Sequence, residues 1–130
     1  MDISIWCIFA AFIMIYVPRL PAIRGALAEE GHIDIANPRQ QQARLTGLAS
    51  RAQAAHLNSV EAFAPFAAAV WVAHHAGVDP GLRDGLAIVF VVSRIGFVAA
   101  YLADLNPWRT LIWTLGFLAV IALFVAAALV

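Results

Sequence analysis

The chain has 130 residues and a formal net charge of zero; 63% of its residues are hydrophobic and only 12% are charged. An ordinary soluble domain is roughly 45–50% apolar and about 25% charged, so the composition excludes that class and predicts an integral membrane protein. The neutral charge gives no indication of a nucleic-acid partner, and the single cysteine excludes a disulfide or a thiolate metal cluster within one chain.

Four apolar segments follow one another along the chain. Each supplies the roughly 20 residues that a helix needs to cross about 30 Å of hydrocarbon, and helices are the only open-chain structure that satisfies the backbone there. We therefore predict an all-α fold, a membrane-spanning four-helix bundle formed by a single domain, residues 1–130. Its helices are expected at about residues 3–28, 50–76, 84–103 and 107–130.

The connections differ in kind. Residues 77–83 ("GVDPGLR") and 104–109 ("DLNPWR") are short, with Pro and Gly to end one helix and Asp or Asn to cap the next. Residues 29–50 form the one long polar loop, and a loop of this length either carries function or is disordered.

The arginines indicate an orientation in the membrane. Five lie between the first two predicted spans: Arg19, Arg24, Arg39, Arg44 and Arg51. Arg109 lies at the third connection, and only Arg83 marks the opposite side. By the positive-inside rule, the first and third connections, including the long loop, are predicted to be cytoplasmic, and both termini are predicted to face outward.

Polar side chains interrupt the second and third spans. Asn58, Glu61 and Pro65 share one face of the second helix with Arg51, and Arg94 lies near the middle of the third. A guanidinium buried alone is costly, and Glu61 is the only acidic residue at a matching depth. One interpretation is therefore a buried ion pair that holds the two helices in register.

A second interpretation is a binding pocket. Arg51, Asn58, Tyr101 and Arg109 are expected to gather near the cytoplasmic mouth, above Arg94. Cationic and amide groups at a wet rim, with apolar walls below, suit an anionic polar ligand that must meet a lipophilic one.

Other polar and aromatic residues have simpler interpretations. The neighbouring His74 and His75 point in different directions, so we expect no metal site. Trp71, Trp108 and Trp113 lie towards span ends, where interfacial anchoring is the default expectation.

Several segments carry a family resemblance. "AHLNSVEAFAPF" (55–66) fits a signature of His, Asn and Glu followed by Pro-Phe in a second helix, and "RIGFVAAYLADLNPWR" (94–109) fits a third-helix run from Arg to Tyr that leads to an Arg. "ANP" (36–38) and "GVDP" (77–80) agree in position. The chain resembles the MAPEG superfamily, membrane-associated proteins of eicosanoid and glutathione metabolism, and within it the microsomal glutathione transferases of bacterial type.

The resemblance implies a homotrimer in a bacterial inner membrane, with sites between subunits near the cytoplasmic face. Glutathione would bind there as co-substrate, and a lipophilic small-molecule substrate would approach through membrane lipid. Asn58 and Glu61 match glutathione contacts, and Arg94 and Tyr101 match polar groups that line the site. Arg109 matches the catalytic arginine that faces the thiol, and a guanidinium there would favour the thiolate.

The chain also departs from the family pattern. Transferase members carry an arginine one turn before the Asn, where this chain has Ala54, and Arg51 is the expected substitute for glutathione binding. Phe97 stands where some members have His. These two departures favour an alternative, a non-catalytic lipid-binding or scaffold protein. A proton-coupled transporter using Glu61 ranks last, because Arg94 at a similar depth would keep that carboxylate ionised.

Overall fold

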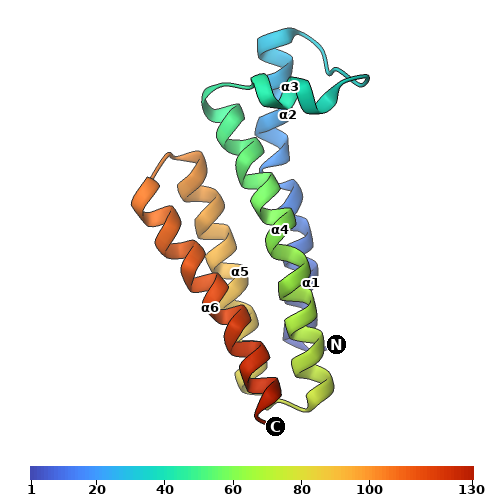
Figure 1. The fold of residues 1–130 in the computed structure, drawn as a ribbon, viewed down its shortest axis with the longest axis vertical. Coiled ribbons are helices and arrows are strands. Elements are labelled where there is room, and N and C mark those ends of the chain that lie inside the picture. The colour runs from blue at the N-terminus through green and yellow to red at the C-terminus, as the bar shows by residue number, and fades with distance from the viewer.

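The computed structural model describes all 130 residues and contains six α-helices (Figure 1). They are α1 (Ile3–Tyr16), α2 (Arg19–Glu30), α3 (Pro38–Arg44), α4 (Gly47–Ala76), α5 (Pro80–Leu102) and α6 (Asn106–Ala128). Both chain termini lie at one end of the molecule, here named the terminal end. The other end, named the loop end, carries α3 and the turn between α5 and α6. The fold is all-α.

The first predicted helix is divided into α1 and α2 by a turn at Val17 and Pro18. Proline has no N–H to donate, so the regular hydrogen-bond pattern fails here and backbone carbonyls become available. The ring Nδ1 of His56 donates a hydrogen bond to one of them, the carbonyl of Ile15, at 2.7 Å. His56 of α4 thus stabilises the break between α1 and α2.

Three helical stretches are long and apolar enough to cross a membrane: Ile3–Glu30, Pro80–Leu102 and Asn106–Ala128. They support assignment as an integral membrane protein. The second predicted span, residues 50–76, corresponds to α4, a continuous helix of 30 residues whose first half carries many polar side chains. That α4 also crosses the membrane stays a prediction.

The helices pack most closely in the half of the molecule near the terminal end. α4 contacts α1, α2, α5 and α6, and α5 and α6 form an antiparallel hairpin. The ring of Phe66 stacks on that of Phe90, with centroids 3.8 Å apart, among small residues that let the helices approach. Towards the loop end, the α5–α6 hairpin diverges from α4 (Figure 1).

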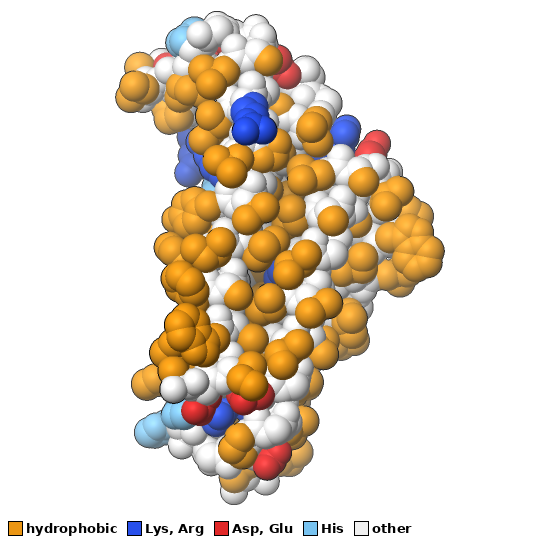
Figure 2. All heavy atoms as spheres, turned by 180° about the vertical axis from the view of Figure 1, so that it is seen from behind, with side chains coloured by type: hydrophobic (Ala, Val, Ile, Leu, Met, Phe, Trp, Pro, Cys, Tyr) orange, Lys and Arg blue, Asp and Glu red, His pale blue; other side chains and the backbone are white.

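A polar cluster closes the terminal end. Arg83 is only 4% exposed, and its guanidinium contacts Asp2 at 2.6 Å, the Ser4 hydroxyl at 3.0 Å and Asp84 at 3.6 Å. Asp2 also lies 3.3 Å from the ring of His74 at the end of α4. These contacts fasten α1, α4 and α5 together. Figure 2 shows that hydrophobic side chains dominate the surface between this end and the loop end.

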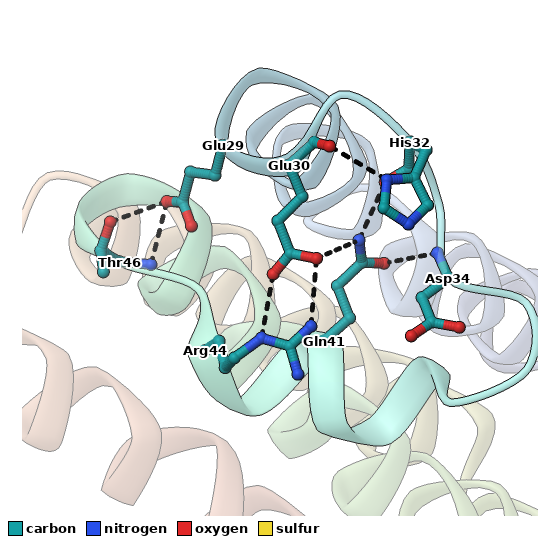
Figure 3. A network of polar contacts seen from close by, with 7 residues as sticks. All are labelled: Glu29, Glu30, His32, Asp34, Gln41, Arg44 and Thr46. Carbon is teal, nitrogen blue, oxygen red and sulfur yellow. Dashed lines mark hydrogen bonds and ion pairs between the residues drawn. The ribbon is translucent and has the colours of Figure 1, made fainter.

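The long loop is ordered by a network of side-chain contacts (Figure 3). Arg44 on α3 forms two hydrogen bonds of 3.0 Å with the carboxylate of Glu30 at the end of α2. Gln41, only 3% exposed, donates to the carbonyl of His32 at 2.8 Å. Glu29 accepts from the backbone and hydroxyl of Thr46, the residue before α4. The loop is therefore a structured cover on the loop end.

The two short connections end their helices differently. Asp79 caps α5 as predicted, because its carboxylate accepts from the backbone N–H of Leu82 at 3.0 Å. No side chain caps α6, whose N-cap residue is Leu105; the cap expected at this turn is absent. Instead, Asp104 adopts a left-handed backbone conformation with φ of 60°, which reverses the chain.

Candidate functional site

A cavity of about 290 Å³ lies between α4, α5 and α6. Three of the six residues predicted for the site line it: Asn58 and Glu61 on α4, and Arg94 on α5. Pro65 of α4 is also on its wall. The remaining surface is mostly apolar, and α6 supplies Trp113, Phe117, Val120, Ile121 and Phe124.

The cavity has a polar end and an apolar end. Asn58 lies seven residues before Pro65 on α4, which is about 10 Å at 1.5 Å per residue. On α6, which runs in the same direction, Trp113 precedes Phe124 by about 16 Å. The polar side chains therefore gather towards the loop end, and aromatic and aliphatic walls extend towards the terminal end. This arrangement fits a ligand pair or an amphiphile with a charged head and an apolar tail.

Arg94 is buried to 4% exposure and contacts neutral groups. Its Nη2 donates to the hydroxyl of Ser59 at 3.0 Å, and its Cζ lies 4.3 Å from the centroid of the Phe97 ring. The chain contains no ion pair between Arg94 and Glu61. The predicted pairing is absent because the Arg94 guanidinium bonds Ser59 instead, while Glu61, two residues further along α4 and on a different side of that helix, stays exposed.

Asn58 brings an unpaired acceptor to the same cavity. Its Oδ1 is buried and has no hydrogen-bond partner. An unpaired buried polar atom costs roughly 1–3 kcal/mol, and most such atoms in proteins have a partner. Asn58, the exposed Glu61 and Arg94 all line this cavity, and together these residue types supply hydrogen-bond acceptors and a cationic donor.

The other three predicted residues lie outside the cavity, nearer the loop end. Arg51 donates from Nε and Nη2 to the carbonyl of Leu102 at 3.3 and 3.2 Å, which caps the C-terminus of α5. Arg109 lies with its Cζ 4.1 Å from the ring centroid of Tyr101. The structure therefore forms two groups, a cavity group and a rim group, where the sequence predicted a single pocket.

A row of rings and cations connects the two groups. The Phe97 ring contacts the Arg94 guanidinium and packs edge-on against the Tyr101 ring, with centroids 5.5 Å apart. The Arg109 guanidinium in turn lies over the Tyr101 ring. Phe97 and Tyr101 follow Arg94 by three and seven residues, so all three share one face of α5. Arg94 in the cavity and Arg109 at the rim are thereby linked through direct contacts.

Sequence reasoning did not predict the role of Ser59, which bonds Arg94, or the apolar and aromatic cavity wall, which includes Trp113. Ser59 was overlooked because a serine in a polar half-helix has no distinctive spacing. Trp113 was interpreted as an interfacial anchor, yet it lines the cavity and stacks on Phe117 with centroids 5.3 Å apart. The signal for Trp113 was its spacing of four and eleven residues from Phe117 and Phe124, which places three rings along one helical face.

Comparisons with known proteins complete the assignment. A search of curated proteins finds no match. The family model described as "MAPEG family" matches residues 3–129, nearly the whole chain. The match agrees with the three apolar helices, which are long enough to span a membrane. The chain therefore belongs to the MAPEG family of membrane proteins.

Proposed function

We propose that the protein is a glutathione-dependent transferase or peroxidase that acts on lipophilic electrophiles or lipid hydroperoxides. The family includes glutathione transferases and peroxidases, and its members generally use glutathione. The observation that carries the proposal is the cavity between α4, α5 and α6, with three hydrogen-bonding side chains at one end and apolar walls at the other.

The polar end suits a small zwitterionic peptide. Glutathione has two carboxylates, one ammonium group and two peptide N–H groups. In the proposed complex, Arg94 binds a carboxylate, while the Asn58 amide oxygen and the Glu61 carboxylate accept from N–H groups. The unpaired Oδ1 of Asn58 supports this assignment, because a ligand donor would satisfy it.

Arg109 is proposed to stabilise the glutathione thiolate, and Tyr101 and Arg51 complete the rim of the site. In transfer, the thiol gives its proton to water, its sulfur forms a bond to the electrophilic carbon, and the leaving group departs with the bonding electrons. In peroxide reduction, two glutathione molecules are oxidised to the disulfide while the hydroperoxide is reduced to an alcohol and water. A nearby guanidinium favours the thiolate in both reactions.

We further propose that the protein is a homotrimer in a bacterial inner membrane, with the loop end cytoplasmic and the sites between neighbouring subunits. Glu61 supports this arrangement. It is exposed on a single chain although it lies among apolar helices, and a carboxylate facing lipid would be costly. A neighbouring subunit would cover it. The lipophilic acceptor would enter from membrane lipid along the apolar walls.

The test is a glutathione titration of purified protein in detergent, followed by turnover assays with chlorodinitrobenzene and with cumene hydroperoxide. We expect saturable glutathione binding and activity in at least one assay. Protein that is folded and trimeric by cross-linking, yet neither binds glutathione nor turns over either acceptor, would overturn the proposal.

A second candidate is a non-catalytic lipid-binding protein on the same fold. Two observations favour it: most of the cavity wall is apolar, and the Arg109 guanidinium rests on Tyr101, outside the cavity lining. Thermal unfolding separates the two candidates. A lipid binder is stabilised by a phospholipid or fatty acid and not by glutathione, whereas the transferase is stabilised by glutathione.

A further inference from the structure

The hydroxyl of Ser59 is held in one orientation. Its proton is donated to the carbonyl of Ala55, one turn earlier on α4, at 2.9 Å. The oxygen lone pair therefore remains for Arg94, whose Nη2 donates to it at 3.0 Å. Both side chains are 4% exposed, so water does not compete for either bond. Ser59 thus fixes one edge of the Arg94 guanidinium.

The Phe97 ring fixes the plane of the same guanidinium. Its centroid lies 4.3 Å from Cζ of Arg94, within the range of a cation–π contact, and the ring is 3% exposed. The edge-on contact with Tyr101 at 5.5 Å restricts the ring in turn. Arg94 is therefore held by an edge contact from α4 and a face contact from its own helix.

Neither partner neutralises the charge. Serine and phenylalanine are uncharged, and no carboxylate lies within ion-pair distance of Arg94. The guanidinium thus lines a largely apolar cavity with its charge uncompensated, a costly state that an anionic ligand would relieve. An intramolecular carboxylate would instead compete with the ligand for Arg94.

We infer that Ser59 and Phe97 are positioning residues that fix Arg94 for a carboxylate of the cavity ligand. The inference rests on the proposed function, in which that ligand is glutathione. A flexible arginine loses side-chain freedom when it binds, whereas one that is already fixed loses little. The two neutral partners thereby raise affinity without touching the ligand.

Affinity measurements test the Ser59 contact. Ser59→Ala is expected to raise the Kd for glutathione about tenfold, the effect of losing one hydrogen bond to a charged group. KM for glutathione should rise with it, while kcat changes less than twofold. Ser59→Thr keeps the hydroxyl and should bind nearly as the wild type does. Ser93→Ala is the matched control, because Ser93 is equally buried and bonds only the carbonyl of Phe90.

A second measurement follows Arg94 itself and does not depend on glutathione. Phenylglyoxal is a small lipophilic dicarbonyl that modifies arginine, and mass spectrometry reports the rate at Arg94. Ser59→Ala and Phe97→Leu should each accelerate modification several-fold relative to wild type and Ser93→Ala. Phe97→Leu also serves if the alanine variant does not fold.

The outcomes separate the inference from the proposed function. If Arg94→Leu weakens glutathione binding but Ser59→Ala and Phe97→Leu alter neither affinity nor modification rate, the positioning inference is overturned. If the wild-type protein does not bind glutathione, the proposed function fails, and the inference then stands or falls on the modification rates.

Discussion

At the scale of single residues, the site keeps polar groups ready for a ligand at a cost to the unliganded protein. The amide oxygen of Asn58 is buried without a partner, and the charge of Arg94 faces a cavity without a counterion. Both states are unfavourable in isolation, and under the proposed function both would be relieved by a bound zwitterion. Binding and stability should therefore respond in opposite directions when these residues are replaced.

Asn58→Leu tests whether ligand binding and stability change in opposite directions. Leucine has a similar size and removes the unpaired amide oxygen, so we expect the free energy of unfolding without glutathione to rise by about 1 kcal/mol. The Kd for glutathione should rise about tenfold, because the ligand loses its acceptor. Chemical unfolding in detergent and calorimetric titration measure the two effects. A variant that is both less stable and unchanged in affinity contradicts the argument.

Arg109→Ala tests the proposed role of Arg109 in stabilising the glutathione thiolate. Without the guanidinium, the pKa of the bound thiol should rise, so the fraction of thiolate at neutral pH falls. We expect kcat with chlorodinitrobenzene at pH 7 to fall about a hundred- to a thousandfold, the range for loss of one electrostatic contact, and to recover partly as pH increases.

The matched control for Arg109→Ala is Arg24→Ala, since Arg24 is an exposed arginine on α2. It should leave the pH profile of turnover unchanged. Undiminished turnover by Arg109→Ala at neutral pH would exclude the assigned role.

At the scale of elements, α2 and α4 pack with almost no space between them. A Cβ added at Gly25 would collide with the Cβ of Ala49, which identifies Gly25 as the point of closest approach. A polar contact ties α5 to α4 towards the loop end, where Arg51 donates to the carbonyl of Leu102. The apolar contact at Gly25 and the polar contact at Arg51 are thus two of the contacts that hold the neighbouring helices against α4.

Gly25→Ala is expected to lower the free energy of unfolding by about 1–3 kcal/mol, because α2 must move away from α4. Gly85→Ala is the control on α5, where nothing lies within 4 Å of the added Cβ. There the better helix propensity of alanine should raise stability by roughly 0.5–1 kcal/mol. Thermal and chemical unfolding of both variants in the same detergent gives the comparison, and equal effects in the two variants would contradict the packing argument.

The long helices could be predicted from the sequence because their apolar runs are nearly continuous. The points at which a helix is interrupted were harder to predict. Pro18 was visible, yet whether a proline bends or divides a helix depends on what satisfies the freed carbonyls, here His56 from another helix. Spacing also placed Asn58, Glu61 and Arg94 on faces that meet. It did not identify the partner of Arg94, because the choice between Ser59 and Glu61 depends on how α4 is rotated against α5.

At the scale of the whole molecule, the half near the terminal end is closely packed, and the half near the loop end holds the polar groups of the candidate site. The half near the terminal end contains the stacked rings of Phe66 and Phe90 and the polar cluster around Arg83. The half near the loop end contains the cavity's polar groups, where the α5–α6 hairpin diverges from α4 (Figure 1). The closely packed half reaches the cavity through Phe90, which stacks on Phe66 and also lines the cavity wall.

Arg83→Met tests how much the polar cluster at the terminal end contributes to stability. Methionine fills a similar volume but leaves the largely buried Asp84 and the half-exposed Asp2 without their cation, so we expect about 1–3 kcal/mol less stability. Arg39→Met, at an exposed position on α3, should change stability by less than about 0.5 kcal/mol. Unfolding in detergent measures both. Comparable small effects would show that the cluster contributes little.

The polar-to-apolar gradient of the cavity has a consequence for how substrate preference could diversify. Ile121 and Phe124 line the end of the cavity furthest from the charged groups, so under the proposed function they would limit the length of the acceptor tail. Shortening either side chain would admit longer tails while the anion-binding end stays as it is. A few substitutions on one face of α6 could therefore change which acceptors the proposed enzyme takes, while the polar residues of the cavity stay the same.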